Sequence, residues 1–322
     1  MTDFKHLFVM DSPENLNMKL DSSLRMAQAL LKRGHRCAIT TPSELSWYSN
    51  NKEKVRASAC WLSLTDEPTP RIEEKTLLEA TDFHAIHMRK DPPFDSHYIS
   101  CTWILSYLEK SAKIYNAPRS LRSLNEKLSI YDFPQYSRAA LLSAETDTIA
   151  EFIRENCEGD AIVKPLDLYG GRGVERINTS EIDPTKLKQI IRQHTKNATE
   201  QRLFQPFDKA IFEGEVRAFT AAGETISWSL KVPADGEYLA NTRSGAVVQP
   251  YKPTSEEISM VQEISQDLLK RGIFLVGYDL IGGYVSEINI TSPRLLVEEG
   301  RDVNPLYARV AELIEMDLVQ KK

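Results

Sequence analysis

Apolar and polar positions along the first part of the chain predict strands and helices in alternation. Runs of apolar residues at 6–11 and 37–40 predict two buried strands. Between them, an amphipathic helix is expected to begin at Asp21 and to end before Gly34, a residue type that is common just after helix ends. This order is typical of an open α/β domain with parallel strands, in which functional sites gather at the carboxyl ends of the strands.

The rest of this first domain has a weaker pattern. Residues 49–76 are polar with little periodicity, so we expect irregular surface structure there. A buried strand at 83–88 then leads into Arg89 and Lys90, at a second strand end. The other elements expected before residue 122 are a helix at 96–110, a short strand at 113–115 and a turn at 116–118.

From residue 123 the pattern changes to shorter, mixed elements. We expect a helix that contains Glu126 and Lys127, a second helix at 147–156, and paired strands at 161–165 and 174–177. The last region holds several strands, a helix at 255–270, a hairpin at 274–290 and a closing helix at 305–316. The predicted fold class is α/β, with an open α/β domain at 1–122 followed by two α+β subdomains at 123–202 and 203–322.

The composition narrows the possible functions. At 322 residues the chain is long enough for two or three domains, and its net charge of -6 argues against a general affinity for nucleic acid or anionic membranes. No stretch has the length and apolar character of a membrane span, and the N-terminus lacks the pattern of a secretory signal. The four cysteines have no CxxC spacing, so we expect reduced thiols in a cytoplasmic protein.

A glycine-rich segment lies between the two strands expected in the middle region. Gly170, Gly171 and Gly173 would let backbone N–H groups approach phosphate oxygens, and Lys164 on the incoming strand would add a positive charge beside them. The segment is neither a Walker A loop nor a dinucleotide fingerprint, because a strand follows it rather than a helix. An ordinary hairpin loop is an equally open interpretation of these residues alone.

A second group of polar residues lies in the hairpin at 274–290. Alternation along a strand places Glu287 and Asn289 on one face, and a three-residue turn at 282–284 would set Asp279 opposite Glu287. Two carboxylates and an amide oxygen would then converge, which suits Mg²⁺ together with nucleotide phosphates. The alternative is a half-exposed hairpin whose polar face is merely solvated.

Several segments together resemble one known family. They are residues 10–13, 17–23, 88–95, 120–122, 125–127, 164–167, 170–171 and 287–293. In this order they resemble the bacterial glutathione synthetases, which have an ATP-grasp fold. The resemblance spans nearly the whole chain, and it implies that the first domain precedes an ATP-grasp fold made of the two α+β subdomains.

The resemblance also implies roles for individual residues in ATP and metal binding. The nucleotide would be bound by Lys127, Lys164, Gly170, Gly171, Gly173, Gln205 and Phe207. The metal, Mg²⁺ or Mn²⁺, would be held by Asp279, Glu287 and Asn289. Arg217 would face the transferring phosphoryl group, with Lys231 as a second catalytic cation. For Arg217 the alternative is a surface ion pair with Glu213 or Glu215.

Substrate-binding residues are implied less directly. Arg89 and Lys90 would recognise an anionic peptide, unless they cap or pair with Asp91 and Asp95, and Asp21 and Ser22 would contribute, unless they only cap a helix. The other residues implied on the substrate side are Asn241, Arg243, Ser292 and Arg294. Here the chain departs from the family pattern, because Leu239 stands where the family has an arginine and Arg294 where it has a small polar residue.

The activity that the resemblance implies is ATP-dependent joining of a carboxylate to an amine. The cysteinyl carboxylate of γ-glutamylcysteine would be phosphorylated, and glycine would attack to give glutathione, ADP and phosphate. Water must be kept away from the acyl phosphate, so loops at 170–173 and 234–245 are expected to close over the site. Alternatives are a sister ligase with another acid or amine, and an ATP-binding regulator that has lost catalysis. The family further implies a homotetramer.

Overall fold

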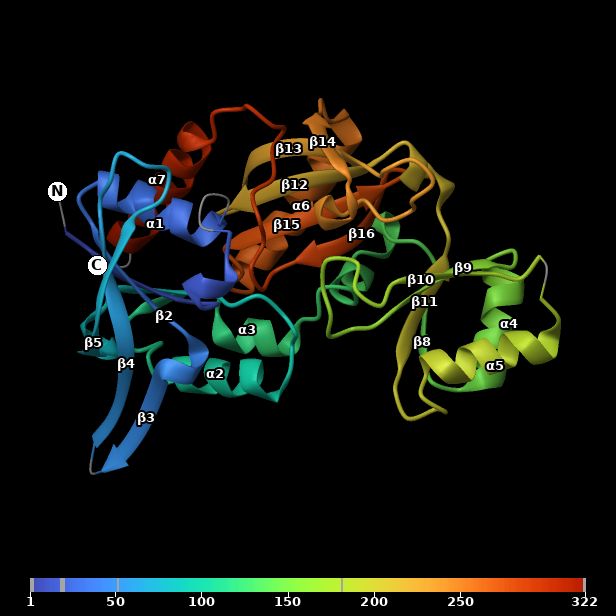
Figure 1. Cartoon of the computed structure of the whole chain (residues 1–322), viewed down its shortest axis with the longest axis horizontal. Helices are drawn as coiled ribbons and strands as arrows, with labels where there is room; N and C mark the ends of the chain where they lie inside the picture. The colour runs from blue at the N-terminus through green and yellow to red at the C-terminus, as the bar shows by residue number, and fades with distance from the viewer. Residues whose placement is uncertain (1–2, 18–20, 51, 181, 321–322) are drawn as a thin grey trace.

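The computed structural model describes residues 3–17, 21–50, 52–180 and 182–320, and within them the chain forms three β-sheets and seven α-helices (Figure 1). Residues 18–20, which belong to one of the segments that carry the family resemblance, lie outside the described residues. The side chain of Arg243 lies outside them as well.

The N-terminal sheet has a parallel centre, as the strand and helix pattern predicts. Parallel pairing runs in the order β2-β1-β6-β7, and β4 joins β2, β3 and β5 antiparallel. The strands are β1 (Lys5–Met10), β2 (Arg36–Thr40), β3 (Leu45–Asn50), β4 (Lys52–Ser63), β5 (Arg71–Glu79), β6 (Ala85–Arg89) and β7 (Lys113–Tyr115). The helices are α1 (Ser22–Lys32), α2 (Ser96–Ser106) and α3 (Pro118–Ser123). The turn expected at 116–118 thus runs directly into α3.

The expectation of irregular structure at 49–76 was wrong. This stretch contains all of β4 and part of β5, which together with β3 form an antiparallel extension of the sheet (Figure 1). Val55, Ala57 and Ala59 alternate along β4 and are buried, with polar residues between them. Alanine carries little hydrophobic signal in a sequence, so this period-two pattern was missed.

The middle region forms a separate four-stranded antiparallel sheet in the order β10-β9-β11-β8. Its strands are β8 (Leu141–Ser143), β9 (Asp160–Lys164), β10 (Glu175–Asn178) and β11 (Arg202–Pro206), and its helices are α4 (Thr146–Asn156) and α5 (Pro184–His194). The strands and the helix expected here are confirmed. Because β11 pairs with β8 and β9, the proposed boundary near residue 202 falls at the start of a strand of this sheet.

The helix expected around Glu126 and Lys127 was wrong. The side-chain oxygen of Asn125 accepts hydrogen bonds from the N–H groups of Lys127 (3.0 Å) and Leu128 (3.3 Å), which closes a turn at 125–128. Asn side chains compete in this way with helical hydrogen bonds. Only a short 3-10 helix, η4 (Ser129–Asp132), follows.

The C-terminal sheet is antiparallel, in the order β14-β13-β12-β15-β16. It contains β12 (Glu215–Ala221), β13 (Glu224–Val232), β14 (Val247–Pro250), β15 (Leu275–Ile281) and β16 (Tyr284–Asn289), with α6 (Ser255–Lys270) and α7 (Asn304–Gln320). Helix α7 packs beside α1 of the first domain, so the two ends of the chain share a hydrophobic core (Figure 1). The expected hairpin and both helices are confirmed.

The turn of this hairpin differs from the expected one. Gly282 and Gly283 form a two-residue turn with positive φ angles of 56° and 80°, and the register shifts between Asp279 and Leu280. Asp279 still lies opposite Glu287, as predicted, because the shift makes up for the shorter turn.

Short 3-10 helices connect several of these elements. Besides η4 they are η1 (Pro13–Asn15), η2 (Pro42–Glu44), η3 (Ala80–Asp82), η5 (Pro134–Tyr136), η6 (Lys209–Phe212) and η7 (Thr242–Ser244). Among the described helices, none has the length and apolar character that crossing a membrane requires.

Candidate active site

A cavity of about 250 Å³ lies between the middle and C-terminal sheets. Its lining combines β9, the glycine-rich loop and β11 with β12, β13, β15 and β16. The predicted site residues that line it are Lys127, Lys164, Gly170, Gly171, Gln205, Phe207, Arg217, Lys231, Asn241, Asp279, Glu287, Asn289, Ser292 and Arg294. Groups that are far apart in the sequence are thus brought to one place.

Asp279 is the centre of the charged cluster in this cavity. It is paired across the sheet with Arg217 on β12 and Glu287 on β16. Its Oδ2 atom lies 3.0 Å from Nη1 of Arg217, and its Oδ1 atom lies 2.7 Å from Nζ of Lys231. The alternative that Arg217 pairs with Glu213 or Glu215 is not what the structure shows, since its ion pair is with Asp279.

Burial and ion pairing act against each other in this cluster. Burial alone would raise the pKa of Asp279, but Arg217 and Lys231 together hold this pKa below its ordinary value. Burial raises the pKa of Glu215, which pairs with Lys231, to about 7. Burial also opposes the charge on Lys231, yet Asp279 and Glu215 raise its pKa. Asp279 and Lys231 therefore carry full charges at neutral pH.

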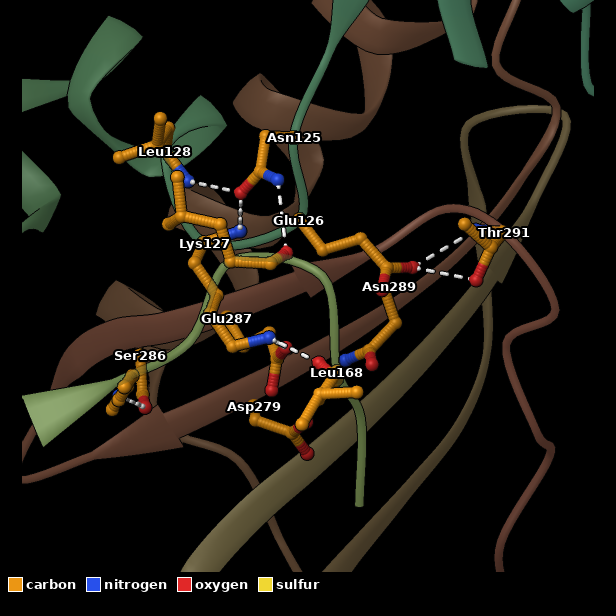
Figure 2. A network of polar contacts seen from close by, with 12 residues as sticks. Asn125, Glu126, Lys127, Leu128, Leu168, Asp279, Ser286, Glu287, Asn289 and Thr291 are labelled. Atoms are coloured by element: carbon orange, nitrogen blue, oxygen red, sulfur yellow. Dashed lines mark hydrogen bonds and ion pairs between the residues drawn. The ribbon is translucent and has the colours of Figure 1, made fainter. Parts of the chain in front are cut away.

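Two lysines contact β16 beside the cluster, and Figure 2 shows one of them, Lys127, next to Glu287. Nζ of Lys127 lies 3.1 Å from Oε1 of Glu287 and donates to the carbonyl oxygen of Leu168 at 2.6 Å. Nζ of Lys164 donates to Oγ of Ser286 at 3.3 Å, and burial lowers the pKa of this lysine. An anion arriving here gains from both lysines, because buried ammonium groups are poorly solvated.

The donor atoms fit a magnesium–triphosphate complex. The Asp279 and Glu287 carboxylates and the Asn289 side chain provide the hard oxygen ligands that Mg²⁺ prefers, and Nδ2 of Asn289 lies 2.9 Å from Oδ2 of Asp279. No group of three or more acidic, His or Cys side chains arranged to hold a metal occurs among the described residues. Two carboxylates with an amide suit an ion that completes its shell with phosphate and water.

The overall charge of the cluster also fits this complex. Counted over the whole lining, seven cationic side chains outnumber six carboxylates: Lys127, Arg138, Lys164, Arg172, Arg217, Lys231 and Arg294 against Asp91, Glu126, Asp208, Glu215, Asp279 and Glu287. The surplus of positive charge favours an anionic ligand.

The opposite end of the cavity is less charged. Gln205 donates from Nε2 to the hydroxyl of Tyr131 at 2.8 Å, and the Phe207 ring lies 3.8 Å beneath the Arg176 guanidinium. Two lining residues here, Arg138 and Tyr284, were missed in the sequence analysis. The guanidinium of Arg138 lies 4.1 Å from the centre of the Tyr284 ring. Arg138 lies in no segment with a recognisable pattern, whereas Tyr284 belongs to the hairpin at 274–290 but was assigned only to its turn.

Two loops contact each other over the cavity. Nδ2 of Asn241 donates to the carbonyl oxygen of Gly170, and a Cβ atom added at Gly171 would lie 3.5 Å from Cδ1 of Leu239. Gly170 and Gly171 have φ angles of 63° and 74°, in the left-handed region that favours glycine. The loops predicted at 170–173 and 234–245 therefore form one cover.

Four predicted substrate residues do not line the cavity. Arg89 is buried and donates to Oγ of Ser23 and to the carbonyl oxygen of Pro293. Lys90 forms an ion pair with Asp11 and donates to the backbone carbonyl oxygen of Asp91 at 2.6 Å. Asp21 accepts a hydrogen bond from Leu24 N–H as the N-cap of α1, and Oγ of Ser22 bonds to Leu295 and Tyr307. Gly173 belongs to the glycine-rich loop but is likewise absent from the cavity lining. The substrate roles of the four residues and the nucleotide-binding role of Gly173 stay predictions.

Glu126 is a lining residue that the sequence analysis did not single out as a site residue. Its Oε1 atom accepts hydrogen bonds from Ile290 N–H (2.8 Å), Thr291 N–H (2.9 Å) and the Thr291 hydroxyl (2.9 Å) (Figure 2). Its carbonyl oxygen accepts from Ile288 N–H. Glu126 thus holds the end of β16, which carries Glu287 and Asn289.

Solved structures of ATP-grasp ligases have the same fold. The D-cycloserine synthetase DcsG matches with a TM-score of 0.68 at 12% sequence identity, over 97% of this chain and 99% of that chain. The ATP-grasp ligase PsnB, solved with a precursor variant, Mg and ADP, matches with a TM-score of 0.61 at 13% identity over 100% of both chains. These likenesses show that the chain has the fold of the ATP-grasp ligases.

Sequence comparison identifies the family. The prokaryotic glutathione synthetase N-terminal domain matches residues 4–122, and the ATP-grasp domain of the same family matches residues 126–302. The glutathione synthetase of Nitrosomonas europaea is 34% identical over 298 residues, which is 90% of each chain. That of Pseudomonas syringae pv. tomato is 32% identical over 318 residues, covering 98% of this chain and 96% of the relative. The chain belongs to the prokaryotic glutathione synthetase family.

Proposed function

We propose that this ligase joins γ-glutamylcysteine to glycine and forms glutathione, ADP and phosphate. One observation carries the proposal: four cationic side chains surround two carboxylates in a single cavity. The cations are Lys127, Lys164, Arg217 and Lys231, and the carboxylates are Asp279 and Glu287. Relatives that match about 90% of the chain are named glutathione synthetase. ATP and Mg²⁺ use follows from the ATP-grasp fold, with Mn²⁺ as a possible substitute.

In this mechanism the cysteinyl carboxylate first attacks the γ-phosphorus of ATP. Lys127 and Lys164 hold the phosphates, and Arg217 stabilises the charge that develops on the transferred group. Mg²⁺ held by Asp279, Glu287 and Asn289 would supply further charge neutralisation and alignment. The bond between the γ-phosphorus and the bridging oxygen breaks, ADP leaves, and an acyl phosphate forms. Phosphate is a much better leaving group than oxide, so the carbonyl carbon can now be attacked by an amine.

The second step joins the two substrates. The neutral amine of glycine attacks the acyl carbon, the C–N bond forms, the bond to the phosphate oxygen breaks, and the nitrogen loses a proton. The loops that carry Gly170 and Asn241 cover the cavity, and this cover excludes water from the acyl phosphate.

The test is ADP release by the purified chain with γ-glutamylcysteine and a panel of amino acids, with products identified by mass spectrometry. We expect glutathione and ADP in equal amounts with glycine, and no turnover after Mg²⁺ is removed with a chelator. Turnover with another amine but not with glycine would contradict the substrate assignment and point to a sister ligase. ATP binding without ADP formation for any pair would favour the regulator.

One observation favours a sister ligase as the second candidate. Leu239 and Arg294, the two departures from the family pattern, both line the cavity. Leu239 belongs to the lid and Arg294 to the segment after β16, where an acceptor rather than ATP would bind.

We further propose a cytoplasmic location and a homotetramer. The four cysteines are free thiols, which supports a reducing compartment. The tetramer rests on the family resemblance, and light scattering of the purified chain tests it.

A further inference from the structure

Arg294 differs from the other cations of the cavity. It lines the cavity and is half-buried, yet among the described residues its guanidinium has no hydrogen bond or ion pair. By contrast, Arg217 is paired with Asp279 and Arg138 with Asp208. Arg172 also lines the cavity, but it is exposed and its guanidinium stacks 5.0 Å from the centre of the Tyr169 ring. A partly desolvated guanidinium without a partner favours the binding of an anion.

The backbone of Arg294 is fixed at the side of the cluster away from the two lysines. Its carbonyl oxygen accepts a hydrogen bond from Nη2 of Arg217 on β12 (3.2 Å), and the carbonyl oxygen of Leu296 accepts from Oγ of Ser229 on β13 (3.1 Å). Lys127 and Lys164 instead contact β16, at the opposite edge of the sheet, beyond β15. The backbone of Arg294 therefore lies beside the guanidinium of Arg217, whereas the two lysines contact residues of β16.

The lid that follows β13 contacts the glycine-rich loop over the cavity, and its one arginine, Arg243, has a side chain outside the described residues. Its described lining residues, at 238–242, are uncharged, and Leu239 lies beside Gly171 of the glycine-rich loop. An anionic substrate group under this lid would thus meet Arg294. The planar fork of an arginine suits a carboxylate, to which it can donate two parallel hydrogen bonds.

We propose that Arg294 binds the carboxylate of the amino-acid acceptor and so selects amines that carry a carboxylate. This inference rests on the proposed function, because it assumes that an amine acceptor enters beneath the lid. Lys127 and Lys164, the cations proposed to hold the triphosphate, contact β16, and Arg217, which would face the transferred phosphoryl group, is already paired with Asp279.

The experiment compares glycine with glycinamide, which has the same amine but no carboxylate, in the wild type and in R294A, R294K, R243A and R119A. Arg119 is exposed on α3 and serves as the charge-removal control. The KM of each of the three substrates and kcat are measured, with thermal unfolding and ATP binding to verify that each variant is folded.

We expect R294A to raise the KM for glycine by roughly 10- to 100-fold, the range for losing a charged hydrogen-bonded pair. The KM for ATP and for the acid should stay within about twofold of the wild type. The preference for glycine over glycinamide should collapse in R294A and return in part in R294K, and R119A should match the wild type.

Three results would overturn the assignment to Arg294 while leaving the proposed function intact. The first two are a rise in KM confined to the acid in R294A, and a loss of the glycine preference in R243A and not in R294A. An active wild type with an unchanged R294A would do the same. A wild-type chain that releases no ADP with any acid and amine would instead overturn the proposed function, and this inference with it.

Discussion

The guanidinium of Arg217 lies against the backbone of Gly277, on the neighbouring strand β15. A Cβ atom at Gly277 would come within 2.5 Å of Nη2 and 2.7 Å of Cζ of Arg217. Gly277 is not at a positive φ angle, so it is the close approach that requires a glycine here. The missing side chain gives Arg217 the space in which it reaches Asp279.

We therefore predict that Gly277→Ala impairs catalysis more than stability. The flexible end of Arg217 can move away from the new methyl group, but it then leaves its place beside Asp279. A displacement of this size lowers kcat roughly 100-fold, while the melting temperature changes by only a few degrees. Steady-state kinetics and calorimetry measure the two effects. Gly34→Ala, at a left-handed position with open space around it, should show the reverse pattern.

Replacement of Glu126 should loosen the end of β16. In Glu126→Ala two buried N–H groups and the Thr291 hydroxyl lose their acceptor, at a cost of about 2–3 kcal/mol in the free energy of unfolding. Because Glu287 and Asn289 lie on the same strand, kcat should fall too. Glu126→Gln keeps an acceptor oxygen, so urea denaturation should find it close to the wild type. Equal losses in both variants would contradict this role.

The contact between the two loops should control how tightly ATP use is coupled to product formation. Leu239→Ala removes about 1 kcal/mol of apolar contact beside Gly171, which lowers the ratio of closed to open cover roughly fivefold. Water then reaches the acyl phosphate, and more ADP is released per glutathione formed. The ratio of ADP to glutathione measures this coupling. If it stays at one in both Leu239→Ala and Asn241→Ala, the loops do not protect the intermediate.

Two buried histidines should make the fold sensitive to acid. Nδ1 of His6 lies 3.1 Å from Nε2 of His87, and both side chains are fully buried. Burial lowers the pKa of His87 to about 3, with Arg89 adding to the effect, and burial and the neighbouring His87 lower that of His6 well below 6.5. The unfolded chain takes up these protons below pH 6.5, whereas the folded chain does not.

The free energy of unfolding should consequently fall as the pH drops from 6.5 towards 3, by up to about 1.4 kcal/mol per pH unit for each histidine. Urea denaturation at pH 7.5, 6.0 and 5.0 measures the slope. His87→Gln should reduce this slope by about 1.4 kcal/mol per pH unit, which corresponds to the uptake of one proton. Replacement of the exposed His97 should leave the slope unchanged. A slope that is equal in all three proteins would refute the assignment to His87.

Local patterns in the sequence were sufficient where neighbouring residues decide the structure. The alternation along the hairpin placed Asp279 opposite Glu287 correctly even though the turn was assigned the wrong length, because strand periodicity restricts which residues share a face. The N-cap at Asp21 and the amphipathic helices were likewise predictable from a few residues. The turn at Asn125 was mistaken for a helix because one side-chain hydrogen bond overrides a weak helical pattern.

Only the tertiary structure decided which charges meet. Arg217 and Asp279 are 62 residues apart, and Glu126 and Thr291 are 165 apart, so no local pattern relates them. Which cation is paired and which, like Arg294, is left without a partner depends on the order of strands in the sheet and on how the segment after β16 crosses it. The sequence alone determined the chemical groups and the faces on which they lie, whereas long-range packing set the distances between them, on which charge interactions depend.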